Sequence, residues 1–430
     1  MTAPTTDSAT HSPEEPWRTL HVPLNDLKLA PTDVARFISH RQCQRYLRLR
    51  LHQRAYGEEF LRANDVVPLT IPPMLRREGD AFEQATVEAI SRVYRTVRLD
   101  RDAPGGNRRD PDNERVIAYI EALEPGETLI LAQPRITARL GAWQLRGDVD
   151  VLKLWRGTDG ALRAFLADIK SSRADRLEHH LQVAIYTLML EEIFREHGIA
   201  HHEIQTGVIF RGPRHTDNEM SDDERAEMER QREAARQFFG LENGLLERVE
   251  DRETYTEIVE DLVTGDESVA LRIARLPFDE VEYHLEAKCD GCIYNEYCMR
   301  RAAERDDVSL IPHLTAHDRS ALRRNGIRTV AEVAALPLGT ESEDAAPDAQ
   351  ELRRALATTW PLSARLDEII YRARRYRASK GDAYDAPPFI PNKGYTSLPY
   401  SDATHNPNLV TIYIDVGHDY LQDRLYMLGA

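Results

Sequence analysis

The sequence predicts an α/β fold, in which strands and helices alternate along the chain. Three segments have the residue pattern of β-strands and are separated by turn residues: Leu129–Leu140, Gln144–Leu154 and Leu162–Lys170. A helix is expected from Arg176 to about His197, and a further strand, Gln205–Phe210, ends before a Gly-Pro pair. This order of elements is typical of a sheet covered by helices.

The region before these strands is predicted to be mainly helical. One helix is expected over Pro31–Tyr46 and beyond, with Cys43 inside it. A second helix is expected from about Leu75 to Val97. A loop rich in Gly, Pro and Asn, Asp102–Asn113, precedes a third helix from Glu114 to about Leu123.

A strongly helical segment, Ser221–Arg248, follows the last predicted strand. Ser221 and Glu224 form a candidate capping box at its start, and its interior alternates acidic residues with arginine. Because this segment is so polar, we expect it to face solvent. We therefore predict a helical insertion at about 214–275.

Length and composition are those of an ordinary soluble globular protein. The 430 residues suffice for two to three domains, and 41% of them are hydrophobic and 30% charged. No apolar run approaches the roughly 18 residues that a membrane span needs, and Met1–Trp17 lacks the basic and apolar segments of a secretion signal. We expect a disordered tail over 1–25, a cytoplasmic location and no membrane partner.

The net charge of −16 is unfavourable for a nucleic-acid partner, because phosphates need local positive potential. The distribution of charge matters more than the sum. Basic residues cluster in Arg36–Arg54, Arg92–Arg101 and Arg372–Lys380, and acidic residues concentrate in Asp217–Glu267. Each basic cluster is equally typical of a solvated helix face.

Carboxylates and a lysine stand at the ends of two predicted strands. Side chains of a strand point alternately to opposite faces, so Asp148 and Asp150 share one face while the neighbouring valines point to a core. In the next strand Asp168 and Lys170 share a face in the same way. If the two strands pair, two carboxylates and an ammonium group converge at one edge of a sheet.

This grouping suits metal-assisted phosphodiester hydrolysis. Mg²⁺ and Mn²⁺ prefer carboxylate oxygens together with water and substrate phosphate. A bound metal lowers the pKa of its water and stabilises charge that develops on a phosphodiester. An isolated Asp-x-Lys is also common on surface strands, so the neighbouring residues have to distinguish a catalytic site from an ordinary surface pair. Gln182 and Tyr186 lie one turn apart on a single face of the helix that follows.

With these residues in place, the chain resembles a known family. The order Gly-x-x-Asp, Asp-x-Lys and Gln-x-x-x-Tyr is similar to the RecB-type branch of the PD-(D/E)XK nucleases, and it is formed here by Gly147 to Asp150, Asp168-Ile169-Lys170 and Gln182 to Tyr186. The family also has an upstream acidic residue or histidine on a helix after a glycine, and Glu83 follows Gly79 here. The resemblance implies a restriction-endonuclease-like core, with a mixed central sheet flanked by helices, a helical insertion and helical C-terminal additions.

The resemblance also implies roles for single residues. The implied ligands of Mg²⁺ or Mn²⁺ are Glu83, Asp150, Asp168 and the carbonyl group of Ile169. Lys170 is expected to position the attacking water, and Gln182 and Tyr186 are expected to contact the nucleic-acid strand. Asp148 shares a face with Asp150 as a candidate neighbour of the metal ligands, and strand alternation alone does not decide which of the two binds the metal.

The chain has four cysteines, Cys43, Cys289, Cys292 and Cys298. In a cytosolic protein they are unlikely partners for disulfides. Four thiolates suffice for an iron–sulfur cluster or a structural Zn²⁺, and their spacing does not separate the two. Iron–sulfur RecB-like nucleases, including AddB-type and CRISPR-associated exonuclease-like ones, have one cysteine before the nuclease motifs and three after them. The resemblance therefore implies a [4Fe–4S] cluster, with Zn²⁺ as the alternative.

The segment 306–337 resembles a helix-hairpin-helix. Thr315/Asp318 and Thr329/Glu332 are start signals for two short helices, and Gly326 lies between them. The usual hairpin of this motif has two glycines, so a simple packing hairpin of two helices is the alternative. A linker and a helix are expected over 338–400.

Residues 401–430 resemble the first hairpin of an RNase H-like exonuclease domain, with strands at Leu409–Val416 and Arg424–Leu428. Gly417 stands where that family has a glutamate, and the domain is incomplete in this chain. The nuclease domain itself is expected over 26–305. The chain can thus be part of a longer protein, and a helicase partner or helicase region is a further expectation.

We therefore predict a metal-dependent nuclease that hydrolyses DNA, as an exonuclease on single strands or ends, in repair, recombination or processing. The alternative is a catalytically silent nuclease fold that binds DNA or serves assembly. The intact set of Asp150, Asp168 and Lys170 favours the enzyme, because a binding module does not need metal ligands. The choice between DNA and RNA, and between terminal and internal cutting, stays open.

Overall fold

The computed structural model describes residues 22–66, 73–100, 110–172, 176–212, 220–339, 345–379, 415–419 and 424–429. The chain forms two compact units, Met1–Glu282 and Tyr283–Ala430. The division lies earlier in the chain than the predicted boundary at 305. Residues 1–21 of the predicted tail lie outside the described part, and Val22 is already buried.

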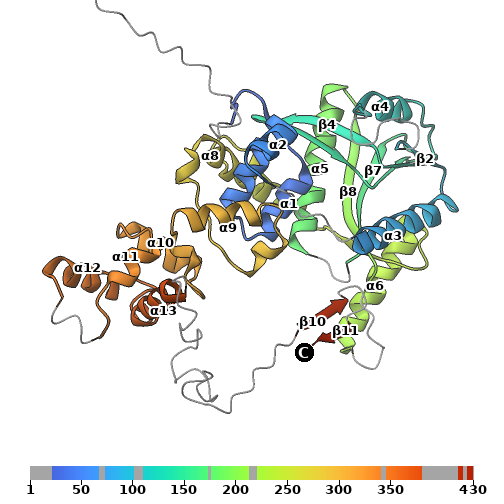
Figure 1. The fold of residues 1–430 in the computed structure, drawn as a ribbon. Helices are drawn as coiled ribbons and strands as arrows, with labels where there is room; N and C mark the ends of the chain where they lie inside the picture. Colours follow the sequence, from blue (N-terminus) through green and yellow to red (C-terminus); the bar gives the residue numbers. More distant parts are fainter. Residues whose placement is uncertain are drawn as a thin grey trace, which may run out of the picture. The chain divides into compact units, whose positions relative to one another are not determined.

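The first unit contains the predicted strands and helices (Figure 1). In chain order, its elements are β1 (Leu27–Leu29), α1 (Pro31–Ser39), α2 (Gln44–Ala63), α3 (Pro73–Ser91), β2 (Thr96–Arg98), α4 (Asn113–Glu121), β3 (Thr128–Ala132), β4 (Arg135–Leu140), β5 (Trp143–Asp148), β6 (Val151–Arg156), β7 (Leu162–Lys170), α5 (Leu177–Glu196), β8 (His201–Phe210), α6 (Asp222–Phe239), β9 (Leu245–Arg248), α7 (Arg252–Val259), the π-helix η2 (Glu260–Thr264), α8 (Val269–Arg275) and the 3₁₀ turn η3 (Phe278–Glu280).

These strands form two sheets. The larger sheet has six strands in the order β2-β3-β6-β7-β8-β9, and the smaller has three in the order β1-β5-β4. In the larger sheet β2 pairs with β3 and β7 with β8 in parallel, and the other neighbours are antiparallel. The predicted α/β class, with a mixed sheet flanked by helices, is confirmed.

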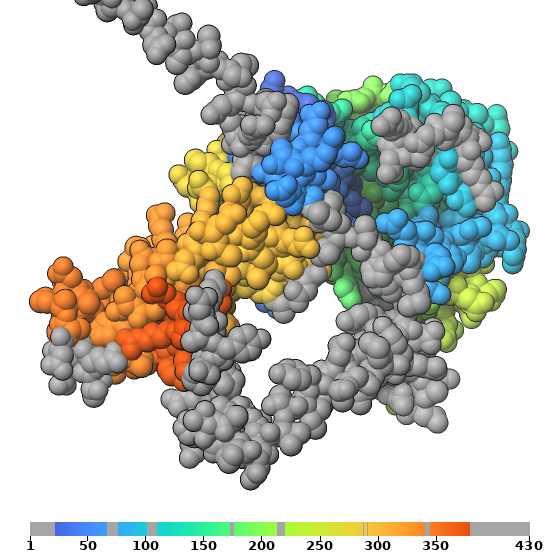
Figure 2. Space-filling model, viewed as in Figure 1, coloured from blue at the N-terminus to red at the C-terminus, as the bar shows by residue number. Residues whose placement is uncertain are grey.

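Helices cover both faces of the six-stranded sheet. Val87 and Ile90 of α3 pack with Ala235 and Phe239 of α6 against alternate residues of the central strands, such as Phe165. On the opposite face lies α5, whose side chains reach Asp168 of β7. Figure 2 shows the outer side of α3, in light blue, at the surface of this unit.

The helical insertion expected at 214–275 is therefore corrected in two respects. The helix ends at Phe239, because Gly240 takes a left-handed conformation (φ 65°) that closes it. After this stop, β9 adds an antiparallel strand to β8 in the main sheet. The apolar residues Ala235 and Phe239 bury one side of α6, and only its other sides carry the charges that suggested exposure.

Two predicted single strands are each divided at the same corner. Leu129–Leu140 becomes β3 and β4, and Gln144–Leu154 becomes β5 and β6. The pairing of β3 with β6 ends at Ala132 opposite Val151, and that of β4 with β5 begins at Arg135 opposite Asp148. Both strands thus pass together from one sheet into the other. Pro134 lies at this corner. Proline has no N–H, and at the corner none is needed for a hydrogen bond between strands.

The first predicted helix is also divided. Arg41 and Gln42 have positive φ values of 53° and 56°, which end α1 and turn the chain into α2. Cys43 consequently lies at the N-cap of α2, not inside a helix. The helix expected to reach Val97 ends at Ser91, and Thr96–Arg98 is strand β2.

The basic cluster Arg36–Arg54 is largely used inside the fold. Arg48 donates to three carbonyl oxygens at the end of α8, at 2.6–2.9 Å. Arg50 and Arg54 form ion pairs of 2.6 and 2.8 Å with the buried Asp33. These three guanidinium groups stabilise the packing of α1, α2 and α8, so they are not a free surface for phosphates.

The second unit is mainly helical in its described part, with two strands near its end. Its elements are the 3₁₀ turn η4 (Ala287–Gly291), α9 (Asn295–Glu304), the 3₁₀ turn η5 (Val308–Leu310), α10 (Ala316–Arg324), α11 (Val330–Ala335), α12 (Pro347–Ala357), α13 (Leu366–Ser379), β10 (Asp415–Asp419) and β11 (Arg424–Gly429). Both predicted start signals, at Thr315 and Thr329, are present as capping boxes. Leu322, Val330, Leu356 and Ile369 belong to one apolar core, so α10 and α11 pack with α12 and α13.

The last two strands form a hairpin. β10 pairs antiparallel with β11, with Asp415 opposite Gly429. Residues 409–414, where the prediction starts the first strand, lie outside the described residues. None of the helices in the described part of the chain combines the length and the apolar composition that a membrane crossing requires.

Position 147 in β5 has to be glycine, because the ring of Tyr186 in α5 packs against its backbone. A Cβ atom at position 147 would lie 2.6 Å from Tyr186 Cε1 and 2.8 Å from its hydroxyl oxygen. We expect Gly147→Ala to lower the free energy of unfolding by about 1–3 kcal/mol, because the buried ring has to shift. Thermal denaturation of the purified variant measures the change.

The matched control is Gly79→Ala in α3, where the nearest atom to a new Cβ is 3.9 Å away. Alanine is the better helix former, so this variant should gain about 0.5–1 kcal/mol. Equal melting temperatures for the two variants would contradict the proposed packing.

Candidate functional site

The ends of three strands meet at one edge of the main sheet. β6 pairs antiparallel with both β3 and β7, so the carboxyl ends of β3 and β7 lie beside the start of β6. The register puts Asp150, just before β6, opposite Asp168 of β7. The backbone N–H of Ile169 donates to Asp150 Oδ2 at 2.6 Å. The predicted convergence of these strands is thus present.

Asp168 is the most enclosed carboxylate of the site, with 2% of its surface exposed. Lys170 Nζ lies 2.6 Å from Asp168 Oδ2, and Gln182 Nε2 donates to Asp168 Oδ1 at 3.0 Å. Asp168 and Lys170 therefore share the face of β7 toward α5, as strand alternation predicts. Ile169 points to the opposite core, where its side chain is buried.

Glu83 reaches the same edge from α3. Its carboxylate accepts a hydrogen bond from the side-chain amide of Gln133, and the same Nε2 donates to Asp150 Oδ1 at 3.1 Å. Gln133 thus joins Glu83 and Asp150. Sequence reasoning missed it, although its position across the corner from Asp150 would have identified it once the strand pairing was drawn.

The electrostatics of the site follow from crowding of like charges. Burial, and then the neighbouring carboxylate of Asp168, raises the pKa of Asp150 to about 7. Burial, followed by the charges of Asp150 and Asp80, raises the pKa of Glu83 to about 7. Burial alone would lower the pKa of Lys170, but the adjacent carboxylates, Asp168 foremost, raise it. Lys170 is therefore a fully charged counter-ion at neutral pH.

Asp148 has a different environment from Asp150. Both of its carboxylate oxygens accept hydrogen bonds from the Arg135 guanidinium, at 2.6 and 2.7 Å. Arg135 comes from β4 and is itself buried. The charge of Asp148 is thus neutralised within the protein, whereas Asp150 adjoins Asp168. Of the two carboxylates that alternation could not separate, the geometry favours Asp150 as metal ligand.

The expected contact of Gln182 and Tyr186 with a nucleic-acid strand stays a prediction, and in this structure both side chains serve the protein itself. The two side chains are only 4% and 2% exposed, so they offer little surface to a strand. Gln182 binds Asp168, and the Tyr186 hydroxyl donates to the backbone carbonyl of Asp148 at 2.7 Å. These hydrogen bonds hold Asp168 and the backbone of Asp148 in place. The part of α5 that makes them is buried on nearly all sides.

The donor set fits a hard divalent cation in its chemistry. Glu83, Asp150 and Asp168 offer carboxylate oxygens, the ligands that Mg²⁺ and Mn²⁺ prefer. A cation would also offset the repulsion that raises two of their pKa values. Within the described residues, no three His, Cys, Asp or Glu side chains are gathered as they would be around an ion. In this arrangement Lys170 supplies the neighbouring positive charge.

The four cysteines are placed by short elements of the two units. Cys43 is the N-cap of α2 in the first unit. In the second unit Cys289 lies in η4, Cys292 directly follows it, and Cys298 lies in α9. The Glu286 N–H donates to Cys289 Sγ at 3.5 Å. Among the described residues, no three of these thiols are gathered as they would be around a metal ion.

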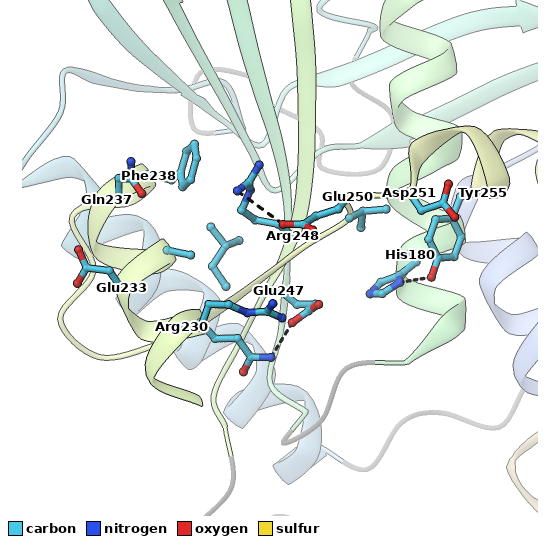
Figure 3. Close-up of a pocket in the computed structure, with 14 residues that line it drawn as sticks. His180, Arg230, Glu233, Gln237, Phe238, Glu247, Arg248, Glu250, Asp251 and Tyr255 are labelled. Atoms are coloured by element: carbon cyan, nitrogen blue, oxygen red, sulfur yellow. Dashed lines mark hydrogen bonds and ion pairs between the residues drawn. The ribbon is translucent and has the colours of Figure 1, made fainter. Parts of the chain in front are cut away.

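A separate cavity of about 470 Å³ lies between α6, β9 and the start of α5 and α7. Figure 3 shows His180 hydrogen-bonded to Tyr255 on one side, and Arg230, Arg248 and Glu247 on the other. Its lining contains four acidic residues and two arginines, and none of the carboxylates described above. Because its net charge is negative, the cavity does not suit a phosphate.

The raised pKa values predict how the metal-free protein responds to pH. Asp150 titrates near 7 when folded and near 4 when unfolded, so the folded state binds more protons between these values and loses stability as pH rises. We expect Asp150→Asn to be more stable than the wild type at pH 8 by about 1–4 kcal/mol, and this difference to shrink as the pH falls toward the unfolded pKa near 4. Melting curves in a chelator measure both.

Asp159→Asn is the control. Asp159 is exposed, and its hydrogen bond from Arg163 lowers its pKa. The same substitution there should slightly reduce stability at pH 8. A stabilised Asp159→Asn, or an Asp150→Asn effect that does not depend on pH, would contradict the assignment of repulsion to Asp150.

Comparison with known proteins is consistent with this geometry. Residues 39–299 match the model of the PD-(D/E)XK nuclease superfamily. One similar solved structure is the "Crystal structure of SSO0001", at 12% identity over 65% of this chain and 91% of that chain, and its TM-score of 0.22 does not establish a shared arrangement. Comparison with the curated proteins found no match. Because the family match spans more than half of the sequence and contains the whole acidic site, the chain belongs to the PD-(D/E)XK nuclease superfamily.

Proposed function

We propose that this protein hydrolyses DNA phosphodiester bonds with Mg²⁺ or Mn²⁺, as an exonuclease on single strands or ends. The observation that carries the proposal is the meeting of Asp150, Asp168 and Lys170 at one sheet edge, with Glu83 opposite. Repair, recombination or processing of DNA is the proposed setting. A helicase partner that supplies single strands is part of the same proposal.

Glu83, Asp150 and Asp168, with the carbonyl of Ile169, would hold the metal. When bound, the metal supplies a Lewis acid that activates water and stabilises charge on the phosphate. The protein contributes fixed carboxylates: Ile169 N–H and Gln133 orient Asp150, and Gln182 orients Asp168. This support matters because metal ligands act only in a defined orientation.

Lys170 has the position and charge to act on the reacting phosphate. Its ammonium group lies beside Asp168, and its side chain is 26% exposed, so it can also face a substrate. We propose that it donates hydrogen bonds to the attacking water and to the phosphate oxygens. Preorganised donors of this kind act where charge develops in the transition state.

Two arginines at the same edge are candidates for phosphate contacts in addition to the predicted contacts of Gln182 and Tyr186. Arg98 ends β2, which is parallel to β3, and Arg211 follows β8, which is parallel to β7. The Arg211 guanidinium lies over the ring of Phe82, which precedes Glu83. Both can attract backbone phosphates without reading the base sequence.

A silent binding module is less well supported. The buried charges of Asp150 and Glu83 reduce the stability of the metal-free fold at neutral pH, as their raised pKa values indicate. A protein that only bound DNA would gain stability by replacing them. Their presence together with Lys170 is explained by a metal-dependent reaction.

Cleavage of end-labelled single-stranded DNA in Mn²⁺ tests the proposal. We expect Asp168→Asn and Lys170→Ala to lower the rate by about 100-fold or more, because each removes a group that acts in the transition state. The exposed Asp159→Asn and Lys28→Ala serve as matched controls and should retain wild-type rates. RNA of the same sequence tests whether the enzyme requires deoxyribose. Circular DNA tests whether it requires a free end.

If the wild type and all variants cleave at the same low rate, the enzyme is a contaminant and the catalytic proposal is wrong. Cleavage of circular DNA would instead replace the exonuclease by an endonuclease.

We also propose that Cys43, Cys289, Cys292 and Cys298 hold a [4Fe–4S] cluster. Their order along the chain supports this, and the N–H to sulfur hydrogen bond at Cys289 is of the kind that tunes cluster potentials. Protein purified without oxygen should be brown and contain about four irons per chain. Cys298→Ser should lose the colour and the iron. Colourless protein with stoichiometric zinc would support the Zn²⁺ alternative.

A further inference from the structure

We propose that Gln133 is a positioning residue that holds the carboxylate of Asp150 turned toward Glu83, so that these two carboxylates bind the metal. The inference rests on the proposed metal-dependent function. It concerns a residue outside the motifs that define the family resemblance. Its basis is the corner at which both strands pass from one sheet into the other.

The strand register continues through this corner without a shift. Ala132 is opposite Val151 on one side, and Arg135 is opposite Asp148 on the other. Between them, the Gln133 N–H donates to the Asp150 carbonyl at 3.1 Å, and the Val149 N–H donates to the Pro134 carbonyl at 3.0 Å. Gln133 is therefore the cross-strand partner of Asp150, as Arg135 is of Asp148.

The two pairs differ in charge. Arg135 donates hydrogen bonds to both carboxylate oxygens of Asp148 and neutralises its charge. The amide of Gln133 is neutral: it orients Asp150 by one hydrogen bond to Oδ1 and leaves the negative charge in place. The second oxygen, Oδ2, is oriented by Ile169 N–H. The carboxylate of Asp150 is thus oriented without an arginine pair such as the one at Asp148.

Gln133 also couples a helix to the sheet. Its Nε2 donates to Glu83 of α3 as well as to Asp150, so two repelling carboxylates share one donor. Its backbone has a left-handed φ of 56° and is held by the hydrogen bond to Asp150. This conformation is uncommon for glutamine, and it aims the side chain at the gap between α3 and the sheet.

The test is Mn²⁺ affinity in the absence of nucleic acid, measured by electron paramagnetic resonance of free Mn²⁺. Gln133→Asn keeps the amide and tolerates a left-handed backbone, but it is one methylene too short to reach both carboxylates. We expect its Kd for Mn²⁺ to rise about 10–100-fold, as for other residues that orient metal ligands.

Gln133→Arg is the more decisive variant, because it places a guanidinium group opposite Asp150, as Arg135 lies opposite Asp148. It should abolish saturable Mn²⁺ binding and raise the melting temperature of the metal-free protein at pH 8. Gln144→Asn and Gln144→Arg, at an exposed position of β5, are matched controls and should bind Mn²⁺ as the wild type does.

The outcomes separate this inference from the proposed function. If the wild type binds Mn²⁺ and both Gln133 variants, still folded by their melting curves, bind it equally well, the role of Gln133 is refuted while the nuclease proposal stands. If the wild type binds no Mn²⁺ and cleaves no DNA, both proposals fall. Weaker binding by both variants, with unchanged Gln144 controls, supports the inference.

Discussion

Two carboxylates, Asp150 and Asp168, lie opposite each other at the end of the β6–β7 pair, and their mutual repulsion is the constraint around which the site is built. A third acid, Glu83, approaches from α3 and adds to this repulsion. The surrounding groups each offset part of it: Lys170 by charge, and the Ile169 amide, Gln133 and Gln182 by hydrogen bonds. The remaining negative charge is what makes the edge suitable for a divalent cation.

The same corner explains residues that seemed to belong to separate motifs. Gly147 makes room for the ring of Tyr186, whose hydroxyl binds the Asp148 carbonyl. Arg135 then fixes the side chain of Asp148. The motif glycine and the motif tyrosine thus form one contact that holds the turn between β5 and β6. Asp150 follows this turn, so its position depends on packing by α5 as well as on its own strand.

The acidic net charge of the chain is easier to understand from these contacts. Many arginines neutralise partners inside the fold, for example Arg50 and Arg54 at Asp33 in the first unit, and Arg319 at Asp307 in the second. A basic segment in the sequence is therefore a poor guide to a phosphate-binding surface. The same holds at the sheet edge, where Lys170 pairs with Asp168, Arg98 with Asp100 and Arg211 with Glu78, so the local arrangement of charges matters more than their sum.

The sequence predicted the α/β class, the shared strand face of Asp168 and Lys170, and the helix starts at Thr315 and Thr329. Each of these follows from local rules: alternation along a strand and capping at a helix start. The folded chain added that Asp150 lies opposite Asp168, that Asp148 is neutralised by Arg135, that Tyr186 is buried, and that Gln133 joins Glu83 to Asp150. These relations depend on which strand lies opposite which, and on what the other face of α5 touches. The periodicity of a single segment does not contain either fact, because pairing and burial are properties of segments that meet only in the folded chain.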